Sequence, residues 1–256
     1  MGSYPRILLG TDGSTDAQAA TQVAGQIAVG LGVPVEVICV REDDKDKDWA
    51  AGILDTAEAQ LRTLGVAEIN PKQSGGDPPD VLIAAANDNP DSLLVVGSSG
   101  LHRASSRLVG STSNRLSHHS LADVLYARDP APKHWNFVAL ATDGTETSYR
   151  AVTRGLNIAR ALDARARLIT AARSQDDGDK VLDEAFAALG LGADVDREVL
   201  VDPQAGSALI LAGWKYEMMV IGNKSMSGPS RLLGSIANKV THGLETNLLL
   251  VNTTRG

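Results

Sequence analysis

The sequence predicts an α/β protein built from two tandem copies of one small domain. Short apolar runs alternate with longer, Ala-rich amphipathic segments through the 256 residues, which is the pattern of strands followed by crossover helices. The run Arg6–Ser14 is echoed by Phe137–Thr145, and both end in Thr-Asp-Gly followed by Ser or Thr. Aromatic residues make up only 4%, so the cores must be aliphatic, which suits helices packed on a buried parallel sheet.

In the first copy, strand-like and helix-like segments alternate in sequence order. The first strand leads into a helix over Asp16–Leu31, with Ser14 where a capping residue belongs. A third helix opens at Pro78, since proline is tolerated in the first helical turn. The other expected elements are strands at Val35–Val40, Glu68–Lys72, Leu93–Val96 and Ala122–Ala127, a helix at Trp49–Leu64, and a fourth helix before the last strand.

The second copy repeats this order from its first strand onward. A helix is expected over Thr147–Leu162, and a third helix opens after Asp202-Pro203-Gln204. The remaining elements are strands at Ala166–Ala171, Val195–Leu200, Glu217–Ile221 and Asn247–Asn252, a second helix at Asp179–Leu189, and a fourth helix before the last strand.

Strands that alternate with helices at these lengths imply right-handed crossovers and a parallel sheet. We therefore expect two doubly wound, Rossmann-like domains, each with a five-stranded, mainly parallel sheet in the strand order 3-2-1-4-5. The Pro-containing stretch Asp129–Lys133 is typical of a linker, which places the domains at residues 1–130 and 134–256.

Composition excludes several classes of partner. The net charge of −7 and a pI near 5.2 argue against nucleic acid, which requires a basic surface. Cys39, the single cysteine, lies in an apolar run and is expected to be a packed thiol. The N-terminus has no signal pattern, and no apolar run approaches roughly 18 residues, so we expect a cytoplasmic protein that does not enter membranes.

A glycine-spaced loop follows the fourth strand of the first copy. It reads Gly97-Ser98-Ser99-Gly100, then nine residues, then Gly110-Ser111-Thr112. Glycines allow a tight turn close to a ligand, and the N–H groups of the next helix attract an anion, so the loop predicts a phosphate site. In such a sheet, Asp12 after the first strand lies at the same edge.

The second copy carries an altered form of this loop. It runs from Gly222 to Ser235, with Ser225 in the place of the second glycine and one residue fewer before Gly234. Serine resists positive φ, so nucleotide binding is less favoured there. The alternative for both copies is structural: the glycines only make the turn, and Asp12 and Asp143 only stabilise the start of the next helix.

With these motifs the chain resembles the universal stress protein family in its tandem two-domain form, whose fold is of the adenine nucleotide α-hydrolase-like type. The resemblance rests on Gly97, Gly100, Gly110 and Ser111 at the spacing of the family's ATP-binding branch. It implies an adenine contact from Asp12. It further implies the binding residues Gly10, Thr11, Val40 and Thr112 and, in the second copy, Asp143, Ala171, Gly222, Gly234 and Ser235.

The expected function is binding of ATP or a related adenine nucleotide, mainly in the first domain, by a nucleotide-responsive stress regulator. Mg²⁺ is an optional companion of the phosphates. No complete Walker A run is present, so we expect no enzyme beyond a slow ATPase. The alternative is a nucleotide-free interaction module of the same fold. The family also implies an intramolecular pseudo-dimer through the final strands, with association into a homodimer left open.

Overall fold

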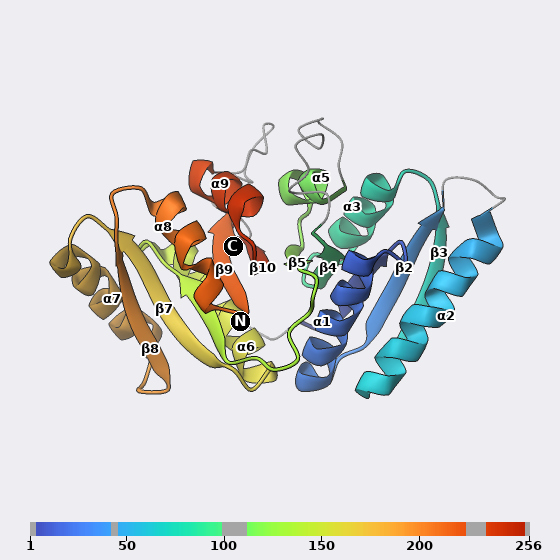
Figure 1. Ribbon diagram of the computed structural model, residues 1–256, viewed down its shortest axis with the longest axis horizontal. Coiled ribbons are helices and arrows are strands. Elements are labelled where there is room, and N and C mark those ends of the chain that lie inside the picture. Colours follow the sequence, from blue (N-terminus) through green and yellow to red (C-terminus); the bar gives the residue numbers. More distant parts are fainter. Residues whose placement is uncertain (1–3, 42–45, 99–111, 224–233, 254–256) are drawn as a thin grey trace. The chain divides into compact units, whose positions relative to one another are not determined.

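The chain divides into two compact units, residues 2–132 and 133–256. The computed structural model describes residues 4–41, 46–98, 112–223 and 234–253, and both units are drawn in Figure 1. The division falls inside the proline-containing stretch Asp129–Lys133. None of the described helices is long and apolar enough to cross a bilayer.

The first unit alternates strands and helices along the chain (Figure 1). Its described elements are β1 (Ile7–Thr11), α1 (Thr15–Leu31), β2 (Val35–Arg41), α2 (Lys47–Leu64), β3 (Ile69–Gly75), α3 (Pro78–Asp88), β4 (Leu93–Gly97), α5 (Thr112–His119) and β5 (Asp123–Ala127). The strands pair in parallel in the order β3-β2-β1-β4-β5. Helices α1 and α2 pack together, as do α3 and α5, because the direction of the crossovers reverses after β3.

The second unit has the same plan. Its described elements are β6 (Phe137–Ala141), α6 (Glu146–Ala161), β7 (Arg165–Ala172), α7 (Gln175–Leu189), β8 (Val195–Val201), α8 (Ala205–Ala212), the short η3 (Gly213–Lys215), β9 (Met218–Asn223), α9 (Ser235–Gly243) and β10 (Asn247–Asn252). Its strands pair in parallel in the order β8-β7-β6-β9-β10. Helix α8 packs on α9, as α3 packs on α5 in the first unit.

Aliphatic side chains fill both cores, as the shortage of aromatic residues predicted. Leu8, Leu9 and Val95 are fully buried in the first unit, and Leu140 and Val220 are fully buried in the second. The central strands are covered on both faces by helices, which explains their nearly continuous apolar sequences.

Two element boundaries differ from the sequence-based expectation by three residues or more. Helix α7 begins at Gln175 and not at Asp179, because the Ser174 side chain caps it by accepting a hydrogen bond from the Asp177 N–H at 3.2 Å. Two acidic residues in the first turn, Asp176 and Asp177, are further stabilised by the positive end of the helix dipole. Strand β3 extends past Lys72 to Gly75, because its last residues still pair with Arg41 and its neighbours on β2.

Candidate functional site

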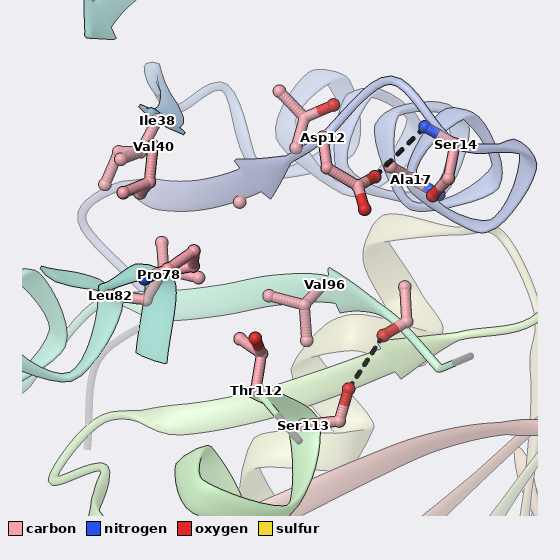
Figure 2. A pocket seen from close by; sticks show the side chains of 13 residues that line it. Asp12, Ser14, Ala17, Ile38, Val40, Pro78, Leu82, Val96, Thr112 and Ser113 are labelled. Carbon is pink, nitrogen blue, oxygen red and sulfur yellow. Dashed lines mark hydrogen bonds between the residues drawn. The ribbon is translucent and has the colours of Figure 1, made fainter. Parts of the chain in front are cut away.

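A pocket of about 220 Å³ opens at the carboxyl ends of β1, β2 and β4 in the first unit. This is the edge at which ligands bind in doubly wound sheets. Figure 2 shows Asp12 and Val40 on one side of the pocket and Thr112 and Ser113 on the opposite side, with Leu82 and Val96 between them. The pocket therefore has an apolar middle and polar groups at two opposite edges.

The turn between β1 and α1 supplies the acidic edge. Asp12 Oδ1 accepts a hydrogen bond from the Ser14 N–H at 3.0 Å (Figure 2). Ser14 Oγ accepts a hydrogen bond from the Ala17 N–H at 3.3 Å. Gly13 has a φ of 76°, which favours glycine. The exposed Asp12 carboxylate thus stabilises the turn and also lies at the mouth of the pocket. The two roles are compatible, since a carboxylate accepts several hydrogen bonds.

Two glycines of the pocket permit close packing. A Cβ on Gly97 would lie 2.8 Å from Asp16 Cβ and 2.9 Å from the Asp16 carbonyl carbon, so only glycine lets β4 approach the first turn of α1. A Cβ on Gly10 would lie 2.9 Å from Leu82 Cδ1 and 3.1 Å from Val96 Cγ1. The absence of a side chain at Gly10 therefore keeps the floor of the pocket open.

The first turn of α5 forms the wall opposite Asp12. Ser113 Oγ donates a hydrogen bond to the Gly97 carbonyl at 3.2 Å (Figure 2), and the Ser113 carbonyl accepts one from the Tyr126 hydroxyl at 3.0 Å. Leu116, fully buried, anchors the same helix. These contacts hold the start of α5, with Thr112, beside the pocket.

An ion-pair cluster joins the two helices that flank the pocket. Arg115 of α5 donates hydrogen bonds to Asp77 Oδ2 at 2.5 Å and to Asp80 Oδ1 at the start of α3. Pro78, which lies between Asp77 and Asp80 in the sequence, lines the pocket. The cluster therefore ties the α3 wall to the α5 wall.

Cys39 lies next to this site, but its thiol is unreactive. Its side chain is fully buried in β2. Burial, and in second place the negative charge of Asp12, raise the pKa of the Cys39 thiol to about 11. The thiol is therefore protonated at neutral pH, and its burial agrees with the packed thiol expected from the sequence.

The pocket brings together the expected residues of the first unit that the structure describes: Gly10, Thr11, Asp12, Val40, Gly97 and Thr112. Gly100, Gly110 and Ser111 lie outside the described residues. Sequence reasoning missed the remaining lining residues, which are Ser14, Ala17, Ile38, Pro78, Leu82, Val96 and Ser113. The apolar ones resemble ordinary core residues in the sequence, and only the strand order brings them to one place.

The second unit has a pocket of about 290 Å³ at the equivalent edge. It is lined by all five residues expected there: Asp143, Ala171, Gly222, Gly234 and Ser235. A Cβ on Gly222 would lie 3.0 Å from Thr253 Cγ2, so this glycine also permits close packing. Gly234 has a φ of −56°, a value that any residue adopts. Ser225 lies outside the described residues.

Comparison with known proteins identifies the first unit. Residues 3–128 match the universal stress protein family. The universal stress protein Rv1636 of Mycobacterium tuberculosis (strain ATCC 25618 / H37Rv) is 29% identical over 144 residues, which cover 49% of this chain and 97% of that protein. The sequence-based resemblance to this family is therefore confirmed.

Two solved structures share the fold over both units. A universal stress protein from Archaeoglobus fulgidus DSM 4304 has a TM-score of 0.76 at 18% identity, covering 98% of this chain and 97% of that chain. The functionally unknown protein PA1789 from Pseudomonas aeruginosa PAO1 has a TM-score of 0.71 at 15% identity, covering 97% and 92%. At such identities the likeness concerns the fold alone, and it agrees with two tandem α/β units.

Proposed function

The chain belongs to the universal stress protein family through residues 3–128, and on this premise we propose that its first unit binds ATP or a related adenine nucleotide. The observation that carries the proposal is the first pocket, in which an exposed aspartate faces the hydroxyl-bearing start of a helix across an apolar middle. Because the second unit repeats the strand order of the first, we extend the family assignment to it and place the two domains at residues 1–130 and 134–256.

The described walls fit the parts of an adenine nucleotide. Ile38, Val40 and Leu82 form an apolar slot for a planar base, and Asp12 accepts hydrogen bonds from an amino group or a sugar hydroxyl. Thr112 and the N–H groups at the start of α5 suit phosphate, since helix starts attract anions. The open floor at Gly10, which a Cβ would narrow, supports the same assignment.

We propose binding without efficient turnover, so that the nucleotide acts as a signal in a stress response. The described residues that line the first pocket include no lysine, arginine or histidine to stabilise charge in phosphoryl transfer. Turnover is expected to stay below about 1 s⁻¹, under the usual enzyme range.

The second candidate is a nucleotide-free interaction module of the same fold. It is favoured by the structural roles of Gly97 and Asp12: close packing against Asp16 explains the glycine, and the hydrogen bond from Ser14 explains the carboxylate. Neither explanation needs a ligand, so binding must be measured directly.

The test is native mass spectrometry of freshly purified protein, followed by calorimetry with ATP on the full chain. Asp12→Ala is expected to weaken ATP binding by about tenfold or more, the loss of one good hydrogen-bonding partner. Asp143→Ala removes the matching turn hydrogen bonds of the second unit, so it controls for structural cost. No copurified nucleotide and no heat with millimolar ATP would leave the nucleotide-free module as the better account.

A further inference from the structure

The walls of the second pocket differ chemically from those of the first at the start of the last helix. Helices α5 and α9 correspond, because Ser113 and Leu116 are buried in one as Ala237 and Val240 are in the other. At the pocket, Thr112 and Ser113 are therefore replaced by Ile236 and Ala237. The Thr112 hydroxyl, and the Ser113 hydroxyl that donates to the Gly97 carbonyl, thus correspond to two aliphatic side chains.

We propose that the second pocket binds an uncharged, nucleoside-sized ligand with an apolar face, and not a nucleotide. This inference uses the correspondence between the two units and does not depend on ATP binding in the first. Three features of the second pocket support it: its apolar walls, its committed hydroxyl groups, and the position of its carboxylate.

Apolar side chains enter the second pocket from three elements. Leu209 of α8, Ile221 of β9 and Ile236 of α9 line it, and Ile236 is 48% exposed. An apolar ligand that covered Ile236 would remove this surface from water, which is favourable. Ala171 stands where the first pocket has the larger Val40, and the volume rises from about 220 to about 290 Å³.

The hydroxyl groups deep in the pocket are already used by the protein. Thr142 Oγ1 and Ser148 Oγ form a hydrogen bond of 2.8 Å with each other. Thr142 Oγ1 also accepts a hydrogen bond from the Gly144 N–H at 3.1 Å, and Ser148 Oγ donates to the Thr145 carbonyl at 2.7 Å. This side of the pocket therefore offers a ligand few further donors for phosphate oxygens.

Asp143 supplies a polar edge of the second pocket, in addition to the exposed Ser235 at the start of α9. Its Oδ1 accepts hydrogen bonds from the Thr145 N–H at 3.3 Å and from the Thr145 hydroxyl at 2.6 Å, which holds the exposed carboxylate at the rim. A carboxylate accepts hydrogen bonds from N–H and O–H donors, such as the amino group and the sugar hydroxyls of a nucleoside. The described residues that line either pocket include no basic side chain, so the two pockets differ in their apolar and hydroxyl groups and not in basic charge.

Adenosine and ATP are the probes that separate the two kinds of ligand. The full chain carries a matched pair of blocking variants, Val40→Trp and Ala171→Trp, because both positions lie partly exposed on the pocket wall at the end of the second strand of their unit. In calorimetry, the Val40→Trp protein is expected to bind adenosine at least about tenfold more tightly than ATP. Adding Ala171→Trp should remove that adenosine binding.

A second variant reports on the helix start. In the Val40→Trp background, the double change Ile236→Thr with Ala237→Ser should shift the ratio of ATP affinity to adenosine affinity toward ATP by about threefold or more. ATP binding to Val40→Trp as tight as that of adenosine, or no adenosine binding by a Val40→Trp protein with native circular dichroism, would overturn the proposal. Failure of ATP to bind Ala171→Trp would instead count against the proposed function of the first unit.

Discussion

The hydroxyl of Tyr126 donates a hydrogen bond to the backbone carbonyl of Ser113 at 3.0 Å. Tyr126 is fully buried in β5, and Ser113 lies in the first turn of α5, where it lines the first pocket. Burial raises the pKa of Tyr126, so the hydroxyl remains a donor throughout the physiological range. The contact therefore fixes the wall of the pocket to the sheet beneath it.

Tyr126→Phe is expected to lower the free energy of unfolding by about 1–2 kcal/mol, because it leaves a buried carbonyl without this donor. Urea denaturation followed by circular dichroism measures the change. Tyr149→Phe is the control, since within the described residues the Tyr149 hydroxyl has no hydrogen-bond partner; a change within about 0.5 kcal/mol is expected there. Equal effects of the two changes would contradict the role given to Tyr126.

Gly97→Ala and Gly52→Ala should change stability in opposite directions. A Cβ at Gly97 would lie 2.8–2.9 Å from Asp16, whereas a Cβ at Gly52, which is exposed in the interior of α2, meets nothing within 4 Å. We expect Gly97→Ala to destabilise by about 1–3 kcal/mol through overpacking. Gly52→Ala should stabilise by roughly 0.5–1 kcal/mol through helix propensity. Thermal unfolding compares them, and a neutral Gly97→Ala would show that this approach of β4 and α1 is loose.

The Glu198 carboxylate should make the free energy of unfolding decrease as the pH is lowered. Burial acts to raise the pKa of Glu198, but hydrogen bonds from Lys215 at 2.5 Å and Tyr216 at 2.6 Å, with the charges of Lys215 and Arg167, hold it below its ordinary value. A carboxyl group with a lowered folded pKa adds stability above its unfolded pKa and loses it as the pH falls through the folded one.

Chemical denaturation at several pH values tests this sign. The wild type should lose stability between about pH 5 and pH 3, and Glu198→Gln should flatten this part of the profile while lowering stability at pH 7. Glu58→Gln, which removes an ion pair within one helix whose Arg62 side chain is 70% exposed, is the control and should have little effect at pH 7. A Glu198→Gln profile parallel to the wild type would refute the assignment.

Cys39 should resist modification in the folded protein. With a pKa of about 11, roughly one thiol in a thousand is ionised at pH 8, and the side chain is fully buried. Maleimide labelling at pH 8 should therefore be slow in buffer and complete in denaturant, with rates that follow unfolding. Labelling as fast as that of a free thiol in native conditions would show that β2 opens locally.

Much of the fold could be predicted from the sequence because the central strands are buried on both faces. Leu93–Val96 and Glu217–Ile221 are apolar runs too short for helices, and each precedes a glycine. The outer strand β3 was expected to end at Lys72, since its alternation fades while its backbone continues to pair. The start of α7 was missed because an acidic first turn resembles a solvated loop.

The site was predictable only where its residues have a pattern of their own. Asp12 and Gly97 stand in turns with a recognisable spacing, and both line the pocket. Leu82 and Val96 have no such sequence pattern, because an aliphatic residue that lines a pocket cannot be told from a core residue until the strand order is known. The replacement of Thr112 by Ile236 likewise became meaningful only when the two helices were compared.

The hydrogen bonds of the two β-strand-to-helix turns bear on how a duplicated domain diverges. Asp12 and Asp143 each stabilise the turn that follows them, so natural selection for folding retains both carboxylates whether or not a ligand is bound. The side chains of Thr112 and Ile236, at the start of the last helix, make no such turn hydrogen bond within the described residues, so this position can change without loss of the turn. A newly duplicated copy can therefore change its ligand while its aspartate persists. The residues at the start of the last helix are then a better guide to the ligand than the aspartate after the first strand.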